Sequence, residues 1–412
     1  MTAGDHLCRS CQAPLAAVVI DLGPSPLSNA LVDAAHAAEP EAVFPLRVFV
    51  CDRCWLVQLP AFESPERIFR DYAYFSSYST TWLAHARAYA AEAVARLGLT
   101  PASAVVELAS NDGYLLKEFQ SRSIPVLGVE PARNVAAQAQ AAGVPTLAEF
   151  FGAALARRLA SEGRSADLVI ANNVLAHVPD VNDFVAGIAI ALKPGGTATL
   201  EFPHVLRMLE RAEFDTIYHE HFSYFSLRAA QRIFERHGLV VADVEELPTH
   251  GGSLRVWVRA AADVSRASDA VRRVLAQELD AGLESARGYA SFAARADAVK
   301  RDLVGFLQEA RRAGKRVAGY GAPAKATTLL NFCGIGPDLL EYTVDRSPHK
   351  QGRLIPGVRI PIAAPEAIFR TRPDFVVVLP WNLKDEIVEQ MSGIRAWGGR
   401  FVVPIPALEV VA

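Results

Sequence analysis

The chain has 412 residues, of which 51% are hydrophobic and 21% are charged, so it is long enough for two or three well-packed domains. A net charge of −3 argues against nucleic-acid and membrane partners. We find neither an apolar run of membrane-spanning length nor a signal peptide in the first residues, and we therefore expect a cytoplasmic protein.

Four of the five cysteines form two C-x-x-C pairs, Cys8 with Cys11 and Cys51 with Cys54. Each pair places two thiolates on one tight turn, and two such turns can complete a tetrahedral zinc site. Four thiolates leave no position for water, so we expect a structural zinc ion that stabilises a small domain. The alternative is four unrelated reduced cysteines.

The stretch Asp71–Ser79 crowds aromatic and hydroxyl-bearing side chains into nine positions, including Tyr72. It fits neither an amphipathic helix nor an alternating strand. A linker packed over a ligand would use such residues, because tyrosine offers both a ring and a donor. An ordinary packed connection is equally consistent. A helix is expected next, over Thr81–Leu97.

A strand, loop, helix and second strand are predicted from residue 104 to residue 130. Ala104–Leu108 and Val126–Val129 are short, apolar and β-branched, as buried parallel strands are. The loop Glu107–Gly113 has one glycine and two acids instead of the G-x-G-x-x-G that a pyrophosphate needs. Such acids suit the positive charges of S-adenosylmethionine, and Glu130 stands where it can accept hydrogen bonds from a ribose. The alternative is an α/β domain whose acids merely solvate a loop.

Alternation of strands and helices continues to residue 262. Asn172 and Asn173 follow a central strand, Asp167–Ala171, and His177 lies just beyond them at the ligand edge of the sheet. We predict further helices over Arg133–Ala142, Phe151–Leu159, Val185–Leu192 and Ser226–His237, and further strands over Thr197–Phe202, Leu239–Glu245 and Leu254–Arg259.

The densest polar cluster is Tyr218–Phe225, YHEHFSYF. In an extended segment His219 and His221 would point one way and Glu220 the other. The spacing differs from the metalloprotease H-E-x-x-H, so a catalytic metal is not expected. A histidine between aromatic rings and a carboxylate can serve as a general base. The alternative is a polar loop that satisfies its own hydrogen bonds.

The motif His250–Arg255, HGGSLR, opens the last strand of this domain. Its two glycines allow close approach of the backbone to a ligand, and Arg255 could pair with a phosphate. A hairpin turn without a ligand is equally consistent.

The remainder of the chain reads as a long helix, Val264–Arg312, followed by a second, smaller Rossmann-like unit. The stretch Gly319–Lys325 carries the pattern G-x-G-x-x-A at the end of a predicted strand. Any diphosphate could bind at the N-terminus of the helix that follows, and Lys325 adds a positive charge there. Further strands are expected over Glu341–Asp345, Phe375–Leu379 and Phe401–Val403. Cys333 is a single cysteine that we expect to be buried.

Together, the C-x-x-C pairs, ELASNDGYLL, NNVLAHVPD, YHEHFSYFS, HGGSLR and GYGAPAKATTLLN resemble the deoxysugar C-methyltransferases of antibiotic pathways over nearly the whole chain. The resemblance implies an α/β protein with three domains. These are a zinc-binding domain (residues 1–68), a class I methyltransferase Rossmann-like domain (69–262), and a helical linker with a C-terminal Rossmann-like domain that helps to hold a dTDP-linked sugar (263–412).

The resemblance also implies roles for individual residues. His221 matches the family's general base, Tyr218 and Glu220 its flanking residues, and His177 and Tyr72 further active-site residues. Glu130 matches the acid that binds the cofactor ribose. We expect additional cofactor contacts from Glu107, Ala109, Asn111, Gly113, Asn172, Asn173 and Ser79. We expect substrate contacts from His250, Ser253, Arg255, Tyr320 and Lys325.

The predicted activity is methylation of a carbon next to the 4-ketone of a dTDP-linked 4-keto-6-deoxysugar, through an enolate that a histidine generates. Carbon 3 is the favoured position and carbon 5 the alternative, and a monomer is the favoured state. Two other interpretations are a nicotinamide-dependent nucleotide-sugar oxidoreductase and a non-catalytic sugar-nucleotide-binding protein with a zinc module. The loop Glu107–Gly113 argues against the first, and Tyr218–Phe225 argues against the second.

Overall fold

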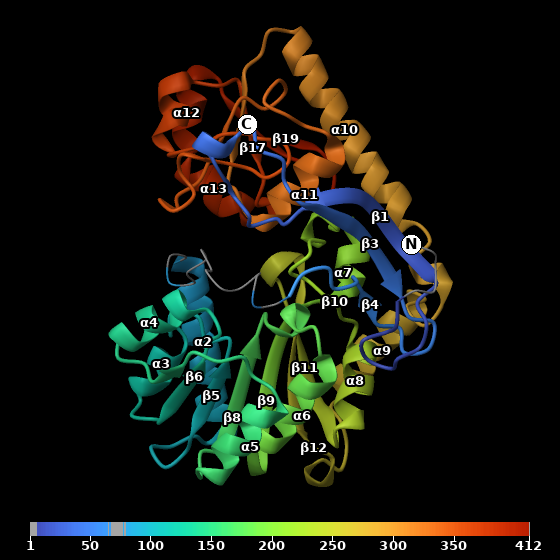
Figure 1. The fold of residues 1–412 in the computed structure, drawn as a ribbon, viewed down its shortest axis with the longest axis vertical. Helices are drawn as coiled ribbons and strands as arrows, with labels where there is room; N and C mark the ends of the chain where they lie inside the picture. Colours follow the sequence, from blue (N-terminus) through green and yellow to red (C-terminus); the bar gives the residue numbers. More distant parts are fainter. Residues whose placement is uncertain (1–5, 65, 67–76, 78–79, 412) are drawn as a thin grey trace.

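The computed structural model describes residues 6–64, 66, 77 and 80–411 (Figure 1). In that part of the chain, sheets of four, seven and six strands follow one another, with a two-stranded ribbon between the first part and the last. The N-terminal strands lie between the seven-stranded sheet and the C-terminal part (Figure 1). None of the helices within these ranges is both long and apolar enough to cross a bilayer.

The N-terminal sheet is antiparallel and takes its last strand from the middle of the chain. Its order is β1 (Ala17–Pro26), β3 (Val43–Val50), β4 (Val57–Gln58) and β10 (Ser223–Tyr224). Strand β10 pairs Ser223 with Gln58 and begins two residues after His221. The first sheet is therefore completed by the segment that carries the predicted base.

The seven-stranded sheet has the order β11-β12-β9-β8-β5-β6-β7, and β12 alone runs antiparallel to the other six. The strands are β5 (Val105–Leu108), β6 (Val126–Val129), β7 (Thr146–Leu147), β8 (Ala166–Asn172), β9 (Leu192–Pro203), β11 (Leu239–Leu247) and β12 (Ser253–Ala260). Its helices are α2 (Thr80–Leu97), α3 (Leu116–Gln120), α4 (Arg133–Ala141), α5 (Ala153–Ser161), α6 (Val181–Ala191) and α8 (Leu227–Arg236). Because β5, β6 and β8 are parallel neighbours, their carboxyl ends bring the predicted cofactor residues to one edge.

Side-chain caps decide where two of these helices begin. Asp180 accepts hydrogen bonds from the N–H groups of Asn182 and Asp183, so α6 begins at Val181, four residues before its predicted start. Ser226 accepts from the N–H of Ala229 and begins α8 at Leu227. Both caps place a chain reversal at the ligand edge of the sheet.

The C-terminal sheet has the order β16-β14-β13-β17-β18-β19 and is parallel except for β19. The strands are β13 (Val317–Tyr320), β14 (Thr343–Val344), β16 (Ile362–Ala363), β17 (Phe375–Val378), β18 (Arg400–Val403) and β19 (Glu409–Val411). Helices α11 (Ala324–Cys333), α12 (Glu366–Thr371) and α13 (Lys384–Gln390) complete it, and Cys333 is buried as expected.

The predicted single helix over Val264–Arg312 is wrong in one respect. The structure has two helices, α9 (Asp269–Asp280) and α10 (Phe292–Arg312), separated by turns. Gly282 lies in the left-handed region with a φ of 80°, and Gly288 packs against the Gly282 backbone, so the helix is interrupted there. Helix α10 then runs along β1 and connects to the C-terminal sheet (Figure 1).

The hydrophobic cores cross the predicted domain boundaries. One core joins the N-terminal sheet, α7 (Val205–Glu210), α10 and the C-terminal sheet, and another joins the cysteine turns to the seven-stranded sheet. Strand β2 (Val32–Asp33) also pairs with β15 (Arg353–Leu354). The three parts of the chain are thus packed into one interlocked body, and the domain boundaries given above stay a prediction.

Candidate active site and zinc site

The two cysteine pairs form matching turns. Cys8 accepts a backbone hydrogen bond from Gln12, Cys51 accepts one from Trp55, and both of these later residues have a positive φ near 60°. The four Sγ atoms lie within 4.8 Å of one another, with 3.5 Å between Cys8 and Cys54. Tetrahedral Zn–S bonds of about 2.3 Å place sulfur atoms about 3.8 Å apart, so this set fits a zinc ion closed to water.

The loop after β5 has the backbone geometry of a ligand-binding turn. Ala109, Asn111 and Gly113 all have positive φ, at 52°, 49° and 77°. A Cβ at Gly113 would lie 2.7 Å from the Val144 side chain, so only glycine fits that position. Strain at two non-glycine residues is typical of functional loops.

Three buried acids meet at this loop. Glu130 accepts hydrogen bonds from the N–H groups of Asn111 and Ala132, each at 2.9 Å. Glu107 and Asp112 each have a buried carboxylate oxygen with no partner among the described residues. Burial, and then the neighbouring charges of Glu130 and Asp112, raises the pKa of Glu107 well above its ordinary value. A bound cation would relieve this cost, so the loop fits the sulfonium and ammonium groups of S-adenosylmethionine.

Asn172 and Asn173 end the neighbouring strand β8 and face the same edge. Within the described ranges, Asn172 Oδ1 and both side-chain polar atoms of Asn173 are buried without a partner. Asn173 has a φ of 56°, and its N–H donates to the Glu201 carbonyl at 2.7 Å. These orphaned groups are a second observation that fits a polar ligand at the ends of β5 and β8.

The residues Tyr218–His221 form a turn, not the extended segment in which the two histidines would share a face. The N–H of His221 donates to the Tyr218 carbonyl at 2.9 Å and closes the turn. The two histidines consequently diverge. His219 packs against Phe44 and Phe62 of the N-terminal part, with ring centroids 5.7 and 6.2 Å away, whereas His221 faces His177.

Hydrogen bonds fix the tautomer of both facing histidines. His221 donates from Nδ1 to the Thr216 carbonyl at 2.8 Å, so its Nε2 is the acceptor and receives the Tyr218 hydroxyl at 2.8 Å. His177 donates from Nδ1 to the Glu220 carbonyl at 2.8 Å, and its ring centroid lies 4.6 Å from that of His221. Burial, reinforced by His177, lowers the pKa of His221 well below its ordinary value, and burial lowers that of His177 to about 4. Both imidazoles are therefore neutral at pH 7.

Lys325 reaches the same region from the first turn of α11. Its Nζ donates to Asn382 at 2.8 Å and lies 4.4 Å from the centre of the Trp381 ring. Burial lowers the pKa of this ammonium, and Asp215 and Glu213 partly offset that effect. Asp215 in turn accepts from the Trp381 indole at 2.7 Å. A partly buried ammonium that donates one hydrogen bond within the described residues suits an anionic ligand.

The second Rossmann-like loop lacks a free acid for a ribose. Asp345, after β14, accepts from the Ala322 N–H at 2.8 Å and pairs with Lys350 at 3.5 Å. Tyr320, at the end of β13, donates to Gln390 at 3.4 Å, so its substrate role stays a prediction.

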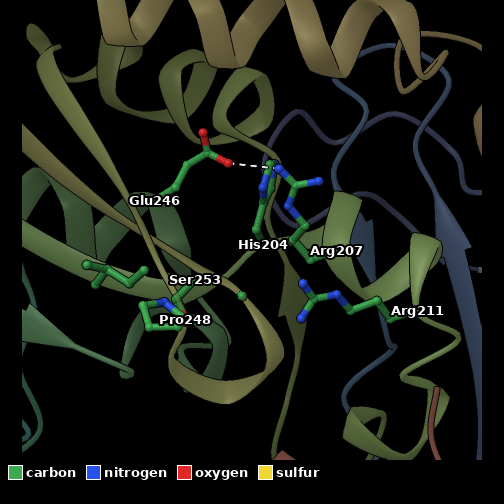
Figure 2. A pocket seen from close by; sticks show the side chains of 8 residues that line it. His204, Arg207, Arg211, Glu246, Pro248 and Ser253 are labelled. Carbon is green, nitrogen blue, oxygen red and sulfur yellow. Dashed lines mark hydrogen bonds and ion pairs between the residues drawn. The ribbon is translucent and has the colours of Figure 1, made fainter.

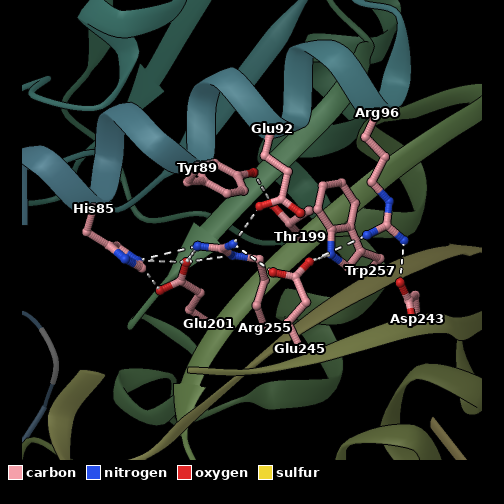
Figure 3. Close-up of polar contacts among 10 residues, drawn as sticks. All are labelled: His85, Tyr89, Glu92, Arg96, Thr199, Glu201, Asp243, Glu245, Arg255 and Trp257. Atoms are coloured by element: carbon pink, nitrogen blue, oxygen red, sulfur yellow. Dashed lines mark hydrogen bonds and ion pairs between the residues drawn. The ribbon is translucent and has the colours of Figure 1, made fainter. Parts of the chain in front are cut away.

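Arg255 is held by carboxylates, which corrects its predicted role as a phosphate ligand. Figure 3 shows its guanidinium between α2 and strands β9, β11 and β12. It donates to Glu201 at 2.6 and 2.8 Å and to Glu245 at 3.0 Å, and its side chain is 4% exposed. Burial would raise the pKa of Glu201, but hydrogen bonds and charge from His85 and Arg255 outweigh it and lower that pKa. This guanidinium has no free face for a phosphate.

His250 and Ser253, the two predicted substrate residues of the H-G-G-S loop, have different surroundings. His250 is partly buried and has a φ of 54°, its ring centroid lies 5.5 Å from that of Trp82, and desolvation lowers its pKa to about 4. Ser253 donates to the Thr249 carbonyl at 2.9 Å and lines a cavity of about 310 Å³ with Arg207 and Arg211 (Figure 2). Arg207 is paired with Glu210 and Glu246, so the charge of that cavity is largely neutralised.

Two predicted site residues, Tyr72 and Ser79, lie outside the described residues. Several residues that the sequence did not single out do join the site: Asn29, which bonds to Glu220, and Asp215 and Trp381 beneath Lys325. The only sequence signal for Asp215 is its place three residues before Tyr218, in D-x-x-Y-H-E-H, and that signal is weak. Nothing local marks Asn29, because it lies in a proline-rich loop 191 residues before its partner.

The order of the seven strands, the single antiparallel β12 and the acid-lined loop after β5 define a class I methyltransferase. Family models match three consecutive parts of the chain: a zinc binding domain at residues 8–69, a methyltransferase domain at 82–244, and a C-methyltransferase C-terminal domain at 248–406. The chain is 38% identical to the C-methyltransferase NovU of Streptomyces niveus over 98% of this chain and 96% of NovU.

Two solved structures that are similar to this chain each cover about half of it. The PH0226 protein of Pyrococcus horikoshii OT3 is 15% identical and covers 48% of this chain and 100% of its own, with a TM-score of 0.39. A magnesium protoporphyrin IX methyltransferase from Synechocystis PCC 6803 is 16% identical and covers 48% of this chain and 99% of its own, with a TM-score of 0.35. The full-length match is decisive: the chain belongs to the S-adenosylmethionine-dependent C-methyltransferases that carry an N-terminal zinc-binding domain.

Proposed function

We propose that this enzyme methylates a carbon next to the 4-ketone of a dTDP-linked 4-keto-6-deoxysugar, with carbon 3 as the favoured position. The observation that carries the proposal is the pair of neutral imidazoles, His221 and His177, beside the Tyr218 hydroxyl. Carbon becomes a nucleophile only after a neighbouring ketone has acidified its proton, so the reaction needs a base and a donor for the enolate oxygen.

His221 is the proposed base. Its Nδ1 is committed to the Thr216 carbonyl, so the lone pair on Nε2 is the basic site. Without substrate this lone pair accepts the Tyr218 hydroxyl. When a ketone approaches, Tyr218 turns its hydroxyl to the ketone oxygen, and Nε2 takes the α-proton while the C–H electron pair forms the enolate.

The cofactor supplies one part of the reaction. Bound S-adenosylmethionine supplies an electrophilic methyl group, which the enolate carbon takes up to form a C–C bond, leaving S-adenosylhomocysteine. Glu107, Glu130 and Asp112 balance the positive charge of the donor on the β5 side. Lys325, partly buried near Asp215 and Glu213, is the proposed partner for the substrate's diphosphate.

Wild-type enzyme tests the proposal directly. It is incubated in deuterated water with S-adenosylhomocysteine and a dTDP-4-keto-6-deoxysugar, and exchange of the α-protons is followed by NMR. Exchange at carbon 3 is expected, followed by methylation at the same carbon when S-adenosylmethionine replaces S-adenosylhomocysteine. Exchange and methylation at carbon 5 would instead favour the alternative position, and turnover only with nucleotides that lack a ketone would refute the proposal.

A further inference from the structure

The carboxylate of Glu220 does not face the histidines. It is buried, with the residue 4% exposed, and it reaches a loop of the zinc-binding domain. The side-chain amide of Asn29 donates to its Oε2 at 2.9 Å, and the Asn29 N–H donates to its Oε1 at 3.4 Å. Among the described residues, Asn29 supplies every hydrogen bond that this carboxylate receives.

The backbone of Glu220 holds the active site on its other side. Its carbonyl accepts the Nδ1 proton of His177 at 2.8 Å, and the next residue is His221. A rotation of Glu220 would therefore move an acceptor of His177 and the whole His221 backbone together. Anchoring the side chain of Glu220 fixes both.

The anchor is itself fixed relative to the catalytic turn. The carbonyl of Ser28 accepts the Thr327 hydroxyl at 2.9 Å, and the next residue of α11, Thr328, donates to the Ile217 carbonyl at 2.7 Å. Ile217 immediately precedes Tyr218. Helix α11 thus sets the position of Asn29 and of the turn at once.

From this geometry we infer that Asn29, in the zinc-binding domain, is a positioning residue for His177 and His221 and acts through Glu220. The inference relies on the proposed function only for the role of His221 as base. Asn29 is exposed, so its replacement opens no cavity in the core. A neutral amide also suits a carboxylate that has no cation beside it in the described part of the chain, because it satisfies the acceptor without demanding a second charge.

The first test is Asn29→Ala. We expect the rate constant for α-proton exchange to fall by about 10-fold to 10²-fold, because small misplacements of a base are costly. The KM values for both substrates should stay within about threefold, and zinc content should be unchanged. The matched control is Asn182→Ala. Asn182 also bridges to the zinc-binding domain, through the carbonyls of Arg9 and Ser10 at 3.1 and 3.0 Å, but it contacts neither facing histidine. The control should keep the wild-type exchange rate.

The second test exchanges donor and acceptor. Asn29→Asp alone places two carboxylates against each other and should slow exchange at least as much as Asn29→Ala. Combining it with Glu220→Gln restores an amide–carboxylate pair with its direction reversed. The double variant should exchange faster than either single variant. A double variant no faster than Asn29→Asp, with full zinc content, would overturn the inference.

A spectroscopic test separates this inference from the proposed function. Nitrogen-15 NMR of labelled histidines reports which ring nitrogen carries the proton. In the wild type, the signal of His177 should show a protonated Nδ1, and in Asn29→Ala this signal should shift or broaden. If no keto sugar exchanges, the proposed function fails while this measurement still decides on Asn29. An unchanged His177 signal in Asn29→Ala overturns the inference.

Discussion

The hydroxyl of Tyr218 lies 2.8 Å from Nε2 of His221, and the two rings are tilted by 32° with centroids 4.0 Å apart. Both side chains project from the same backbone turn, and their polar ends are in hydrogen-bond contact. In the absence of substrate, the Tyr218 hydroxyl therefore donates to the Nε2 lone pair that the proposed base uses, so neither group lacks a hydrogen-bond partner. It also places a donor next to the atom that removes the proton.

His221→Asn should abolish both proton exchange and methylation. Asparagine keeps much of the shape and a donor, but it lacks a base of useful pKa. We expect a loss of about 10²-fold or more in both rates, with both ligands still bound in calorimetry. Tyr218→Phe is the comparison variant and should slow both steps less, because a water molecule can partly replace the lost hydroxyl as donor. Exchange at the wild-type rate in His221→Asn would move the base to His177.

Glu130→Ala should weaken the binding of S-adenosylmethionine by tens-fold. The reason is the loss of charged hydrogen bonds to the ribose, each of which contributes roughly 1.5–3 kcal/mol. Isothermal titration calorimetry with S-adenosylhomocysteine measures the change, and dTDP binding serves as the internal control. If Glu130→Ala bound the cofactor as tightly as the wild type, the ribose site could not be at the end of β6.

Replacing one thiolate of the cysteine cluster should release the metal. Wild-type protein should contain about one zinc ion per chain by elemental analysis, and Cys51→Ser should contain much less and unfold at a lower temperature. Cys333→Ser is the matched control, because Cys333 is buried but lies outside the cluster. Zinc-free protein with normal thermal stability would contradict this assignment.

Arg255→Met should destabilise the fold without altering substrate affinity. Glu201 and Glu245 would lose their guanidinium, and breaking a buried ion pair costs about 3–5 kcal/mol. Urea unfolding measures the loss. Arg259→Met, on the same strand, should cost about 1 kcal/mol or less, since within the described residues Arg259 donates only to the Gly195 carbonyl, at 3.4 Å. Normal stability with weakened dTDP-sugar binding would restore the phosphate role for Arg255.

Stability should fall as pH rises through neutrality because of the acids near Lys325. Burial, and then the charge of Asp215, raises the pKa of Glu213 to about 8, and burial raises that of Asp215 to about 6. A raised carboxyl pKa stabilises the folded state at low pH, and this contribution is lost as pH rises through the folded value. The free energy of unfolding should drop by up to about 1.4 kcal/mol per pH unit for each proton in this window.

Glu213→Gln is the variant that isolates this effect. It should flatten the decline between pH 6 and about 8, since glutamine stays neutral. Chemical unfolding at a series of pH values gives the slopes. Glu235→Gln, an exposed acid on α8, is the control and should leave the slope unchanged. Identical slopes in wild type and Glu213→Gln would show that another group titrates.

The sequence was sufficient for features that short segments determine. Buried parallel strands such as Val105–Leu108 are continuous apolar runs, and the paired C-x-x-C turns carry their own ligand pattern. The methyltransferase sheet, the zinc-binding domain and the family were therefore predicted correctly.

Features that distant segments decide were missed. The turn at Tyr218–His221 contains neither glycine nor proline, and partners elsewhere, such as the Ala176 carbonyl that accepts from Phe222, hold the chain after it. Arg255 was misread because its partner Glu201 reaches it only through the register of β9 with β12. The roles of the individual site residues stay predictions until the variants above are measured.

Strand β10 has a consequence for biosynthesis. The sheet that begins with β1 stays open at β4 until residues 59–222 have left the ribosome, because β10 is its last strand. An unpaired strand edge in a nascent chain is a site of aggregation. The N-terminal part expressed alone should therefore be poorly soluble even when zinc is supplied. We expect that the zinc-binding domain cannot be transferred to another protein without β10.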